Sequence, residues 1–303
     1  MPAPTVQKAA ALEIGKLNQP VVTLYQVALI IFELYQAGSY RGEKLASLKK
    51  SHANRSDCTR NINALIENGV LEESNAVRHK EVFSVLGRES SSINEIACSV
   101  DPFAYISHLS AMEWHGLTDR IGRVLTYSSP PPKRWREHAW QKMQKDLGQQ
   151  NIQEFFRQNL PQLKRLNVKK ISRVSVHRYL SDHLGAFVSI KGRCLRVSTI
   201  GRTFLDMIRE PNLCGGIRHV IDAYTEHAPR YQKQIIDEID RHGTKIDKVR
   251  AGYVLEEHAN ITSPAINTWT EFAQRGGSRK LDANSPYSPD YSERWCLSLN
   301  LEA

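Results

Sequence analysis

The stretch Asn54-Arg55-Ser56-Asp57-Cys58-Thr59-Arg60-Asn61-Ile62-Asn63-Ala64-Leu65-Ile66-Glu67-Asn68-Gly69 has the pattern of one helix with two unlike faces. Apolar side chains recur at helical spacing and are predicted to face a core: Cys58, Ile62, Leu65 and Ile66. The opposite face carries side chains of the kinds that bind base edges and phosphates: Arg55, Thr59 and Asn63, flanked by Ser56 and Arg60. Gly69 is a typical residue for the end of such a helix.

Two further helices are expected upstream of this stretch. Thr23-Leu24-Tyr25-Gln26 has the capping-box form, in which the Thr and Gln side chains satisfy free backbone donors at a helix start. The helix that begins there is expected to end at Gly38, and a short second helix is expected over 42–50, with Leu45 and Leu48 turned inward. Residues 1–20 are expected to be a helical or frayed lead-in.

Downstream, 70–73 and 79–85 are expected to be two strands around the turn Ser74-Asn75-Ala76. Three helices and a hairpin in this order predict a winged helix-turn-helix, whose third helix enters the major groove of duplex DNA and whose hairpin forms the wing. The alternative is a small helical domain with an ordinary solvated polar face.

Ten side chains follow as candidate DNA contacts. Four are predicted to contact bases or phosphates from the third helix: Arg55, Thr59, Arg60 and Asn63. Six are predicted to hold the DNA backbone: Arg41, Asn54, Ser56, Arg78, His79 and Lys80.

Length and composition indicate a globular protein. The 303 residues are enough for two domains, and 41% hydrophobic with 24% charged residues is ordinary for a soluble chain. No uncharged apolar run approaches the roughly 18 residues that a membrane span needs, and the N-terminus lacks the pattern of a signal peptide. A cytoplasmic protein without a membrane partner is therefore expected.

The cysteines and histidines do not suggest a metal or a cofactor. The five cysteines are scattered without a CxxC pair, which argues against a disulfide framework and against a zinc site. Most are expected to be small core residues. The 11 histidines show no metal-ligand spacing such as HExxH.

The net charge of +9 is unevenly placed along the chain. Between Lys133 and Arg178 there are 12 basic and 3 acidic residues, so this segment alone equals the whole excess. A basic segment of this kind suits a polyanion, because phosphate contacts release counterions. Residues 1–90 carry only +2, which is a mild argument against DNA binding by the first domain.

The polar run Arg88-Glu89-Ser90-Ser91-Ser92 is expected to separate two domains, a winged helix-turn-helix over 1–90 and a helix-rich, mixed α/β domain over 91–303. The whole chain is thus predicted to be α+β. A basic insertion over about 134–166 is expected to form helices whose inward side chains are Trp140, Met143, Leu147, Ile152, Phe155 and Phe156.

The remaining elements of the second domain follow from local patterns. Ser107 is expected to cap a helix that buries Ala111 and Trp114 and ends at Gly116. The alternation over 171–177 predicts one strand, and Gly192 is expected to turn a hairpin between 187–190 and 194–198. Thr199 with Ser198 is expected to cap a helix over 200–209.

No catalytic pattern is present, and the sequence predicts no enzyme. It has no GxSxG elbow, P-loop or GxGxxG after a strand. The basic loop Arg275-Gly276-Gly277-Ser278-Arg279-Lys280 could hold a phosphate, although a plain flexible loop is favoured. Arg202 and Asp206 are spaced for a surface ion pair worth a few tenths of a kcal/mol.

Several segments of the second domain resemble the AbiE-type antitoxin domain (AbiEi). They are Tyr105-Ile106-Ser107-His108-Leu109-Ser110-Ala111 with His115-Gly116-Leu117-Thr118, the segment 197–216, the segment 250–256, and Arg294-Trp295. The part around Arg202 to Asp206 is the most specific. The motif positions that the resemblance marks are Ser107, Gly116, Arg202, Thr203 and Asp206. The basic insertion is longer than this family leads one to expect.

The resemblance implies the antitoxin of a type IV toxin–antitoxin pair that acts in abortive phage infection. Its N-terminal domain would repress its own operon by binding inverted repeats in the promoter. Its functional partner would be an AbiEii-like nucleotidyltransferase toxin, which type IV antitoxins oppose without necessarily forming a stable complex. The alternatives are a stand-alone winged-helix regulator with a ligand-sensing or dimerising second domain, and a nucleic-acid-modifying enzyme that uses the basic segment.

Overall fold

The computed structural model describes residues 3–88, 92–183, 185–274 and 279–301. Its helices and mixed sheets confirm the predicted α+β class. The chain forms two compact units: the first consists of 1–105, 128–184 and 189–196, and the second of 106–127, 185–188 and 197–303. Most of the polar run at 88–92 and of the glycine-rich loop at 275–280 lies outside the described residues.

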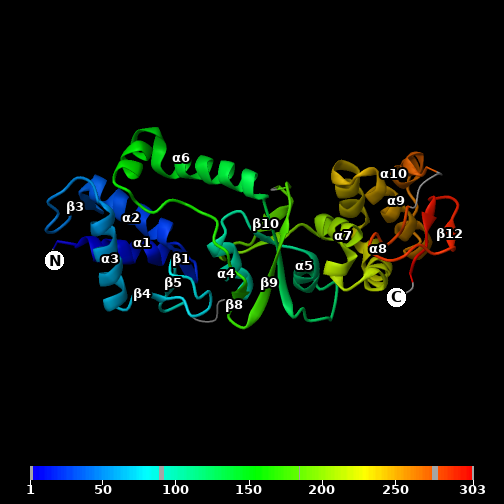
Figure 1. Cartoon of the computed structure of the whole chain (residues 1–303), viewed down its shortest axis with the longest axis horizontal. Helices are drawn as coiled ribbons and strands as arrows, with labels where there is room; N and C mark the ends of the chain where they lie inside the picture. The colour runs from blue at the N-terminus through cyan, green and yellow to red at the C-terminus, as the bar shows by residue number, and fades with distance from the viewer. Residues whose placement is uncertain (1–2, 89–91, 184, 275–278, 302–303) are drawn as a thin grey trace. The chain divides into compact units, whose positions relative to one another are not determined.

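The N-terminal part of the first unit has the order of elements of a winged helix (Figure 1). These elements are α1 (Val6–Lys16), β1 (Val21–Thr23), α2 (Leu24–Ala37), α3 (Arg55–Glu67), β4 (Leu71–Glu73) and β5 (Val82–Val85). The strands form an antiparallel sheet in the order β1-β5-β4, with Val22 opposite Phe83 and Glu72 opposite Ser84. The segment expected as a lead-in is therefore a core helix, since Ala9, Ala10 and Ile14 are fully buried.

Local sequence determines where α2 and α3 begin and end. Thr23 and Gln26 form the predicted capping box, and Gly38 ends α2 in the left-handed conformation, with a φ of 60°. At α3, Asn54 and Asp57 form a second capping box. Both boxes satisfy backbone N–H groups that the first helical turn leaves without partners.

The predicted helix over 42–50 is wrong. The chain instead forms a small hairpin of β2 (Ser39–Tyr40) and β3 (Glu43–Lys44), followed by irregular structure. Arg41 and Gly42 both have positive φ values, 51° and 84°, which suit a two-residue hairpin turn and cannot continue a helix. Leu45 is nevertheless buried, as predicted, because it packs against the same core.

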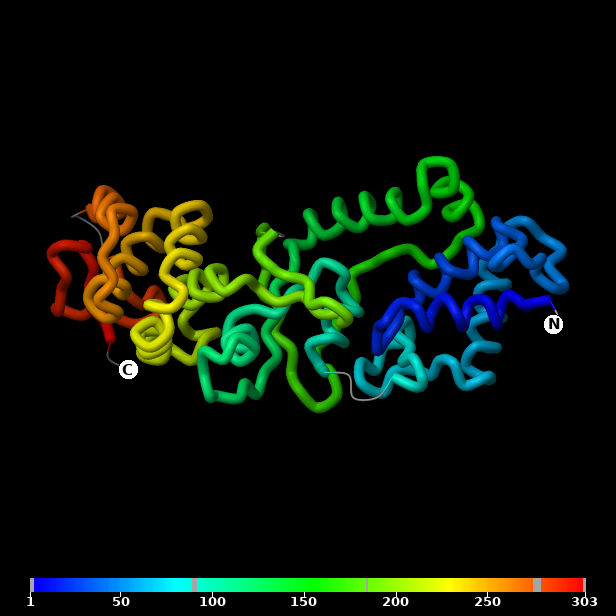
Figure 2. Tube along the Cα trace, turned by 180° about the vertical axis from the view of Figure 1, so that it is seen from behind, coloured from blue at the N-terminus to red at the C-terminus, as the bar shows by residue number. Residues whose placement is uncertain are grey.

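The basic insertion packs on the winged helix. It forms α6 (Pro132–Arg157), which bends at Gly148, where φ is 72°. The chain then runs back alongside α6 through the return segment, residues 159–168 (Figures 1 and 2). The ring of Phe155 is fully buried and meets Phe32 of α2 edge-on, at 5.2 Å between centroids. The basic insertion and residues 1–90 share one hydrophobic core and belong to the same compact unit. A domain boundary at residue 90 therefore does not divide them.

The strand predicted over 171–177 is a hairpin. It consists of β8 (Lys170–Ile171) and β9 (Val174–Leu180), paired antiparallel with Ile171 opposite Val174. The chain reverses because Ser172 has a φ of 56°. Both strands belong to a six-stranded sheet of order β10-β11-β6-β7-β9-β8, whose other members are β6 (Tyr105–Ile106), β7 (Val124–Ser129), β10 (Phe187–Ser189) and β11 (Arg196–Ser198). The first unit also contains α4 (Ile93–Val100).

The second unit is mainly helical. Its helices are α5 (His108–His115), α7 (Ile200–Arg209), the 3-10 turn η1 (Pro211–Cys214), α8 (Ile217–His242), α9 (Lys245–Tyr253), the π-turn η2 (Val254–His258), α10 (Pro264–Trp269) and η3 (Thr270–Phe272). A two-stranded sheet of β12 (Tyr291–Ser292) and β13 (Leu297–Ser298) follows. Within α8, two helical stretches meet at a kink, with non-helical geometry at Tyr231, two residues after Pro229. No helix in the described part of the chain is long and apolar enough to cross a membrane.

Candidate nucleic-acid interface

Helix α3 presents the two faces that its sequence predicts. Cys58, Ile62 and Leu65 are buried, and burial raises the pKa of the Cys58 thiol to about 12. The exposed side chains lie on the other face: Arg55, Ser56, Thr59, Arg60 and Asn63. This polar face is therefore available to a partner along the length of the helix. Asn54 has a different role, because its side chain accepts from the Asp57 N–H as the helix cap, at 2.9 Å.

A buried carboxylate anchors the start of α3. The side chain of Asp57 is 3% exposed and is bonded to the Arg60 Nη2 at 2.6 Å and to the Lys50 Nζ at 3.0 Å. Burial raises the pKa of Asp57, but hydrogen bonds from Lys50, the Asn54 backbone and Arg60 outweigh it and leave the pKa below its ordinary value. Asp57 therefore stays ionised, and its ion pair holds the guanidinium group of Arg60 in place on the exposed face of α3.

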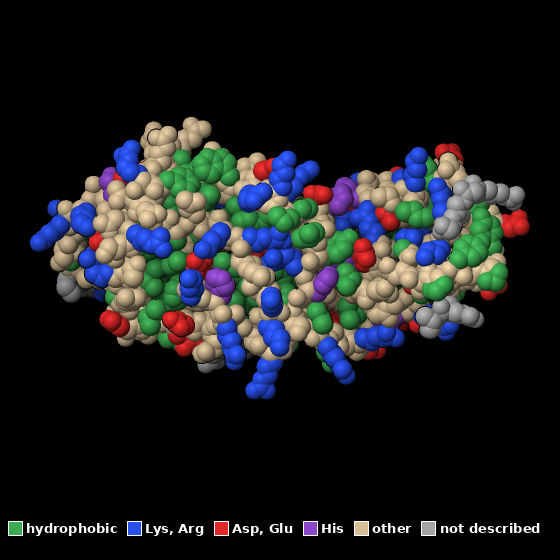
Figure 3. Space-filling model, viewed as in Figure 1, with side chains coloured by type: hydrophobic (Ala, Val, Ile, Leu, Met, Phe, Trp, Pro, Cys, Tyr) green, Lys and Arg blue, Asp and Glu red, His purple; other side chains and the backbone are tan. Residues whose placement is uncertain are grey.

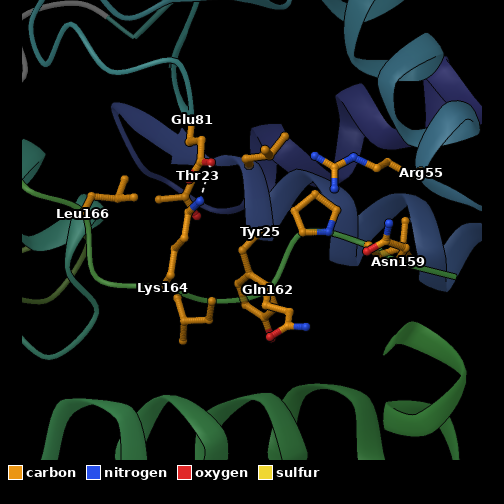
Figure 4. Close-up of a pocket in the computed structure, with 12 residues that line it drawn as sticks. Thr23, Tyr25, Arg55, Glu81, Asn159, Gln162, Lys164 and Leu166 are labelled. Carbon is orange, nitrogen blue, oxygen red and sulfur yellow. Dashed lines mark ion pairs between the residues drawn. The ribbon is translucent and has the colours of Figure 1, made fainter. Parts of the chain in front are cut away.

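Arg55 borders a cavity of about 300 Å³ between the winged helix and the return segment. Figure 4 shows Arg55 reaching into this cavity from α3, opposite Tyr25 of α2 and Gln162 of the return segment. Lys164 crosses to the base of the wing, where its Nζ pairs with Glu81 at 2.6 Å. Arg55 therefore lies beside the return segment. The exposed guanidinium of Arg55 forms no ion pair among the described residues.

The wing is the loop 74–81 between β4 and β5, which is longer than the predicted turn. Its tip is closed by Arg78 N–H, which donates to the Ser74 carbonyl at 2.8 Å, and by Val77 N–H, which donates to Ser74 Oγ at 3.3 Å. Arg78 and Lys80 are exposed, whereas His79 is half-buried and accepts from Glu81 N–H through Nδ1. Arg78 has a positive φ of 52°, in keeping with its place in a turn.

Arg41 lies apart from the wing in the chain, in the β2–β3 turn. It is exposed, and its guanidinium stands over the Tyr40 ring at 5.3 Å from the centroid. The contact limits the freedom of this cation without neutralising it.

The first unit carries more than the whole basic excess of the chain. It has 26 Lys and Arg against 15 Asp and Glu, a net charge of +11, while the second unit has 15 against 17. The weak charge of residues 1–90 is thus supplemented by the basic segment that folds onto them. Sequence analysis missed four cations near the wing, namely Lys164, Lys169, Lys170 and Arg173. The basic run and the alternating strand pattern were visible, but not their position beside the wing.

The antitoxin-motif positions lie inside the second unit. Arg202 and Asp206 form an ion pair at 2.7 Å with each side chain 1% exposed, so the predicted surface pair is wrong. Thr203 is fully buried and bonds to Ser198 Oγ at 2.8 Å. These three residues stabilise the packing of α7, and their burial prevents direct contact with a partner.

Some of the predictions for the ends and the buried side chains of α5 are confirmed, and others are wrong. Gly116 ends α5 in the left-handed conformation, and Ala111 is fully buried. Ser107 occupies the N-cap position, but its side chain makes no capping bond and lies 2.9 Å from His108 Nδ1 instead. Trp114 is 38% exposed rather than buried, and in the first unit Trp140 is likewise 46% exposed.

The C-terminal motif segments meet in space. Trp295 is fully buried, and its ring lies so close to Gly252 of α9 that a Cβ there would stand 2.1 Å from it. The Trp295 indole N–H and Arg294 Nε both donate to Glu256 Oε2, at 2.8 and 2.6 Å. The pairing of Gly252 in α9 and Glu256 in η2 with Arg294 and Trp295 in the tail thus has a packing explanation.

No protein-family model and no curated protein matches the chain. Among solved structures, the chain is similar to the crystal structure of the Rv2827c protein from Mycobacterium tuberculosis, with 12% sequence identity and a TM-score of 0.48. That match covers 97% of this chain and 91% of the other.

Proposed function

We propose that this protein binds duplex DNA through its first unit, with α3 in the major groove and the wing on the flanking backbone. The observation that carries the proposal is the exposed face of α3, which presents Arg55, Thr59 and Asn63. The opposite face of α3 is buried, and the elements around it follow the order of a winged helix. Amide and guanidinium groups on a groove-sized helix match the donors and acceptors of base edges.

The charge of the first unit supports the same proposal. A net +11 in the unit that contains α3 favours association with a polyanion, and the cations of the wing add backbone contacts. Such contacts strengthen binding to any duplex, whereas the α3 side chains supply discrimination. The two kinds of residue therefore predict different changes on substitution.

The binding experiment compares the full chain on its own promoter duplex and on a shuffled duplex of equal length, over a range of salt concentrations. We expect Arg55→Ala and Asn63→Ala to lose about 1–3 kcal/mol of discrimination between the two duplexes. Lys80→Ala should weaken both equally and reduce the salt slope by about 0.9. Lys233→Ala, an exposed lysine of α8 in the second unit, is the matched control. Equal affinity of the unsubstituted chain for both duplexes would reject sequence-specific binding.

We further propose that the protein is an AbiEi-like antitoxin that represses its own operon, with an AbiEii-like nucleotidyltransferase toxin as its functional partner. What supports this is the resemblance of the segments 105–111, 115–118, 197–216 and 250–256, together with Arg294-Trp295. Side chains from several of these segments contribute to one hydrophobic core of the second unit, including Leu117, Phe204, Leu255 and Trp295.

Co-expression with the adjacent gene tests the antitoxin proposal. If that gene encodes a toxin, the full chain should restore growth, and the α3 variants should also restore growth from a heterologous promoter, because they alter only DNA binding. A stand-alone regulator would bind the promoter without protecting the cell. Metal-dependent cleavage of nucleic acid by the purified chain would instead indicate an enzyme.

A further inference from the structure

The β8–β9 hairpin ends beside the wing. Its turn, Ser172-Arg173, joins β8 and β9, and the Ser172 backbone N–H donates to the Ala76 carbonyl in the wing at 2.6 Å. Ile171 at the base of the turn is 1% exposed and Val77 of the wing is 7% exposed, so both tips are fixed by buried apolar side chains. Figures 1 and 2 both show the two hairpins ending at the same edge of the first unit.

Both tips carry exposed cations. On the β8–β9 side these are Lys169, Lys170 and Arg173, and on the wing they are Arg78 and Lys80. Within the described chain, none of the five forms an ion pair with an acid. Figure 3 shows Lys and Arg side chains projecting below the position of the β8–β9 hairpin, away from the body of the unit.

Acidic residues are absent from both tips. The sequence has no Asp or Glu between Glu154 and Asp182, and none from Ser74 to Lys80. The nearest acids along the wing are Glu72 and Glu73 on β4 and Glu81 at its base, and Glu81 is already paired with Lys164. The two tips therefore present uncompensated positive charge at one edge.

We propose that β8–β9 is a second wing, which binds the phosphate backbone of duplex DNA next to the stretch contacted by the first wing. The inference rests on the proposed DNA binding by α3. The backbone bond between Ser172 and Ala76 couples the two hairpins, so a duplex that reaches the wing also reaches Lys169, Lys170 and Arg173. Lysine and arginine on a hairpin tip contact phosphates without selecting bases.

The test uses the full chain with Lys169, Lys170 and Arg173 all changed to Ala. Its affinities for promoter and shuffled duplexes should fall by the same factor, and its salt slope should decrease by about 2–3, close to 0.9 for each lost phosphate contact. Hydroxyl-radical footprinting should show protection lost only at the outer edge of the site. The control replaces Arg230 and Lys233 on α8 and should leave slope and footprint unchanged, and circular dichroism checks that each variant folds.

The outcomes separate this inference from the proposed function. If the unsubstituted chain binds and Asn63→Ala loses discrimination, but the triple variant keeps the full slope and footprint, the second wing is refuted and the α3 proposal stands. If the unsubstituted chain binds no duplex even at low salt, both are refuted. A triple variant that changes discrimination rather than the slope would also overturn the inference, because backbone contacts do not select bases.

Discussion

Asp57 shows how one buried acid can order the candidate recognition helix. It belongs to the capping box of α3 and holds Arg60 and Lys50, whose side chains are 65% and 56% exposed. The sequence alone predicted the helix and its two faces, because apolar spacing is a strong signal. It did not predict the ion pairs, because the position of Lys50 depends on a loop whose conformation was wrongly expected to be helical.

Replacing Asp57 with Asn should lower the free energy of unfolding by about 1–3 kcal/mol near neutral pH, through loss of a charged cap and its hydrogen bonds. Because the pKa of Asp57 is lower in the folded chain, its contribution is present above the unfolded value and is lost as pH falls through the folded one. In urea titrations the two proteins should therefore differ at pH 7 and converge as the pH falls well below 3.8, the ordinary pKa of an aspartate. Ser56→Ala, an exposed neighbour, is the control, and an equal loss at both pH values would contradict the assignment.

The buried pair of Arg202 and Asp206 makes a different prediction. Removing one partner breaks a buried ion pair, so Asp206→Ala should cost about 3–5 kcal/mol. Arg202→Met combined with Asp206→Leu should be less destabilising than Asp206→Ala, because no buried charge remains. Urea unfolding followed by circular dichroism measures both. A single variant within 1 kcal/mol of the unsubstituted chain would mean that the pair is solvated in solution.

At the scale of the element, the failures of sequence analysis share one cause. The helix expected over 42–50 would start in a turn at Arg41 and Gly42, which both have left-handed φ, and the strand expected over 171–177 contains such a turn at Ser172. Hydrophobic spacing in short segments cannot reveal such turns, since arginine and serine adopt this conformation only when surrounding contacts favour it. The bounds of α7 were predicted, because Thr199 caps its start and Pro211 follows its end, and both are signals that the local sequence carries.

Two glycines in helices of the chain should respond oppositely to alanine. Gly252 in α9 has no room for a Cβ beneath Trp295, so Gly252→Ala should destabilise by about 1–3 kcal/mol or more. Gly15 in α1 has open space around it, so Gly15→Ala should stabilise by about 0.5–1 kcal/mol through reduced chain entropy. Thermal unfolding of the two variants should move in opposite directions. Destabilisation of both by similar amounts would show that helix packing does not explain the effect at Gly252.

Across the molecule, chain order conceals which segments belong together. The segment 133–178 follows the polar run at 88–92, so sequence reasoning assigned it to the second domain. Its apolar side chains instead complete the core of the first unit, which brings their attached cations to the candidate DNA-binding surface. Periodicity predicted that Met143, Leu147 and Phe155 are buried, but it carries no information on which partner buries them.

This shared core predicts that the winged helix depends on α6. Phe155 is fully buried and meets Phe32 and Tyr25 of α2 edge-on, with ring centroids 5.2 and 6.2 Å apart. Phe155→Ala in the full chain should therefore cost about 3–5 kcal/mol and weaken α2 directly. Hydrogen exchange should show faster exchange of the α2 amides, and the affinity for the promoter duplex should fall although every predicted DNA contact is intact.

Gln141→Ala, at an exposed position of the same helix, is the matched control and should leave exchange in α2 unchanged. A fragment of residues 1–90 lacks Phe155 altogether and should unfold at a lower temperature than the first unit of the full chain, because its α2 face is left uncovered. If the α2 amides of Phe155→Ala and of the fragment were as protected as those of the full chain, the winged helix would be an independent domain. The basic segment would then contribute charge but no stability.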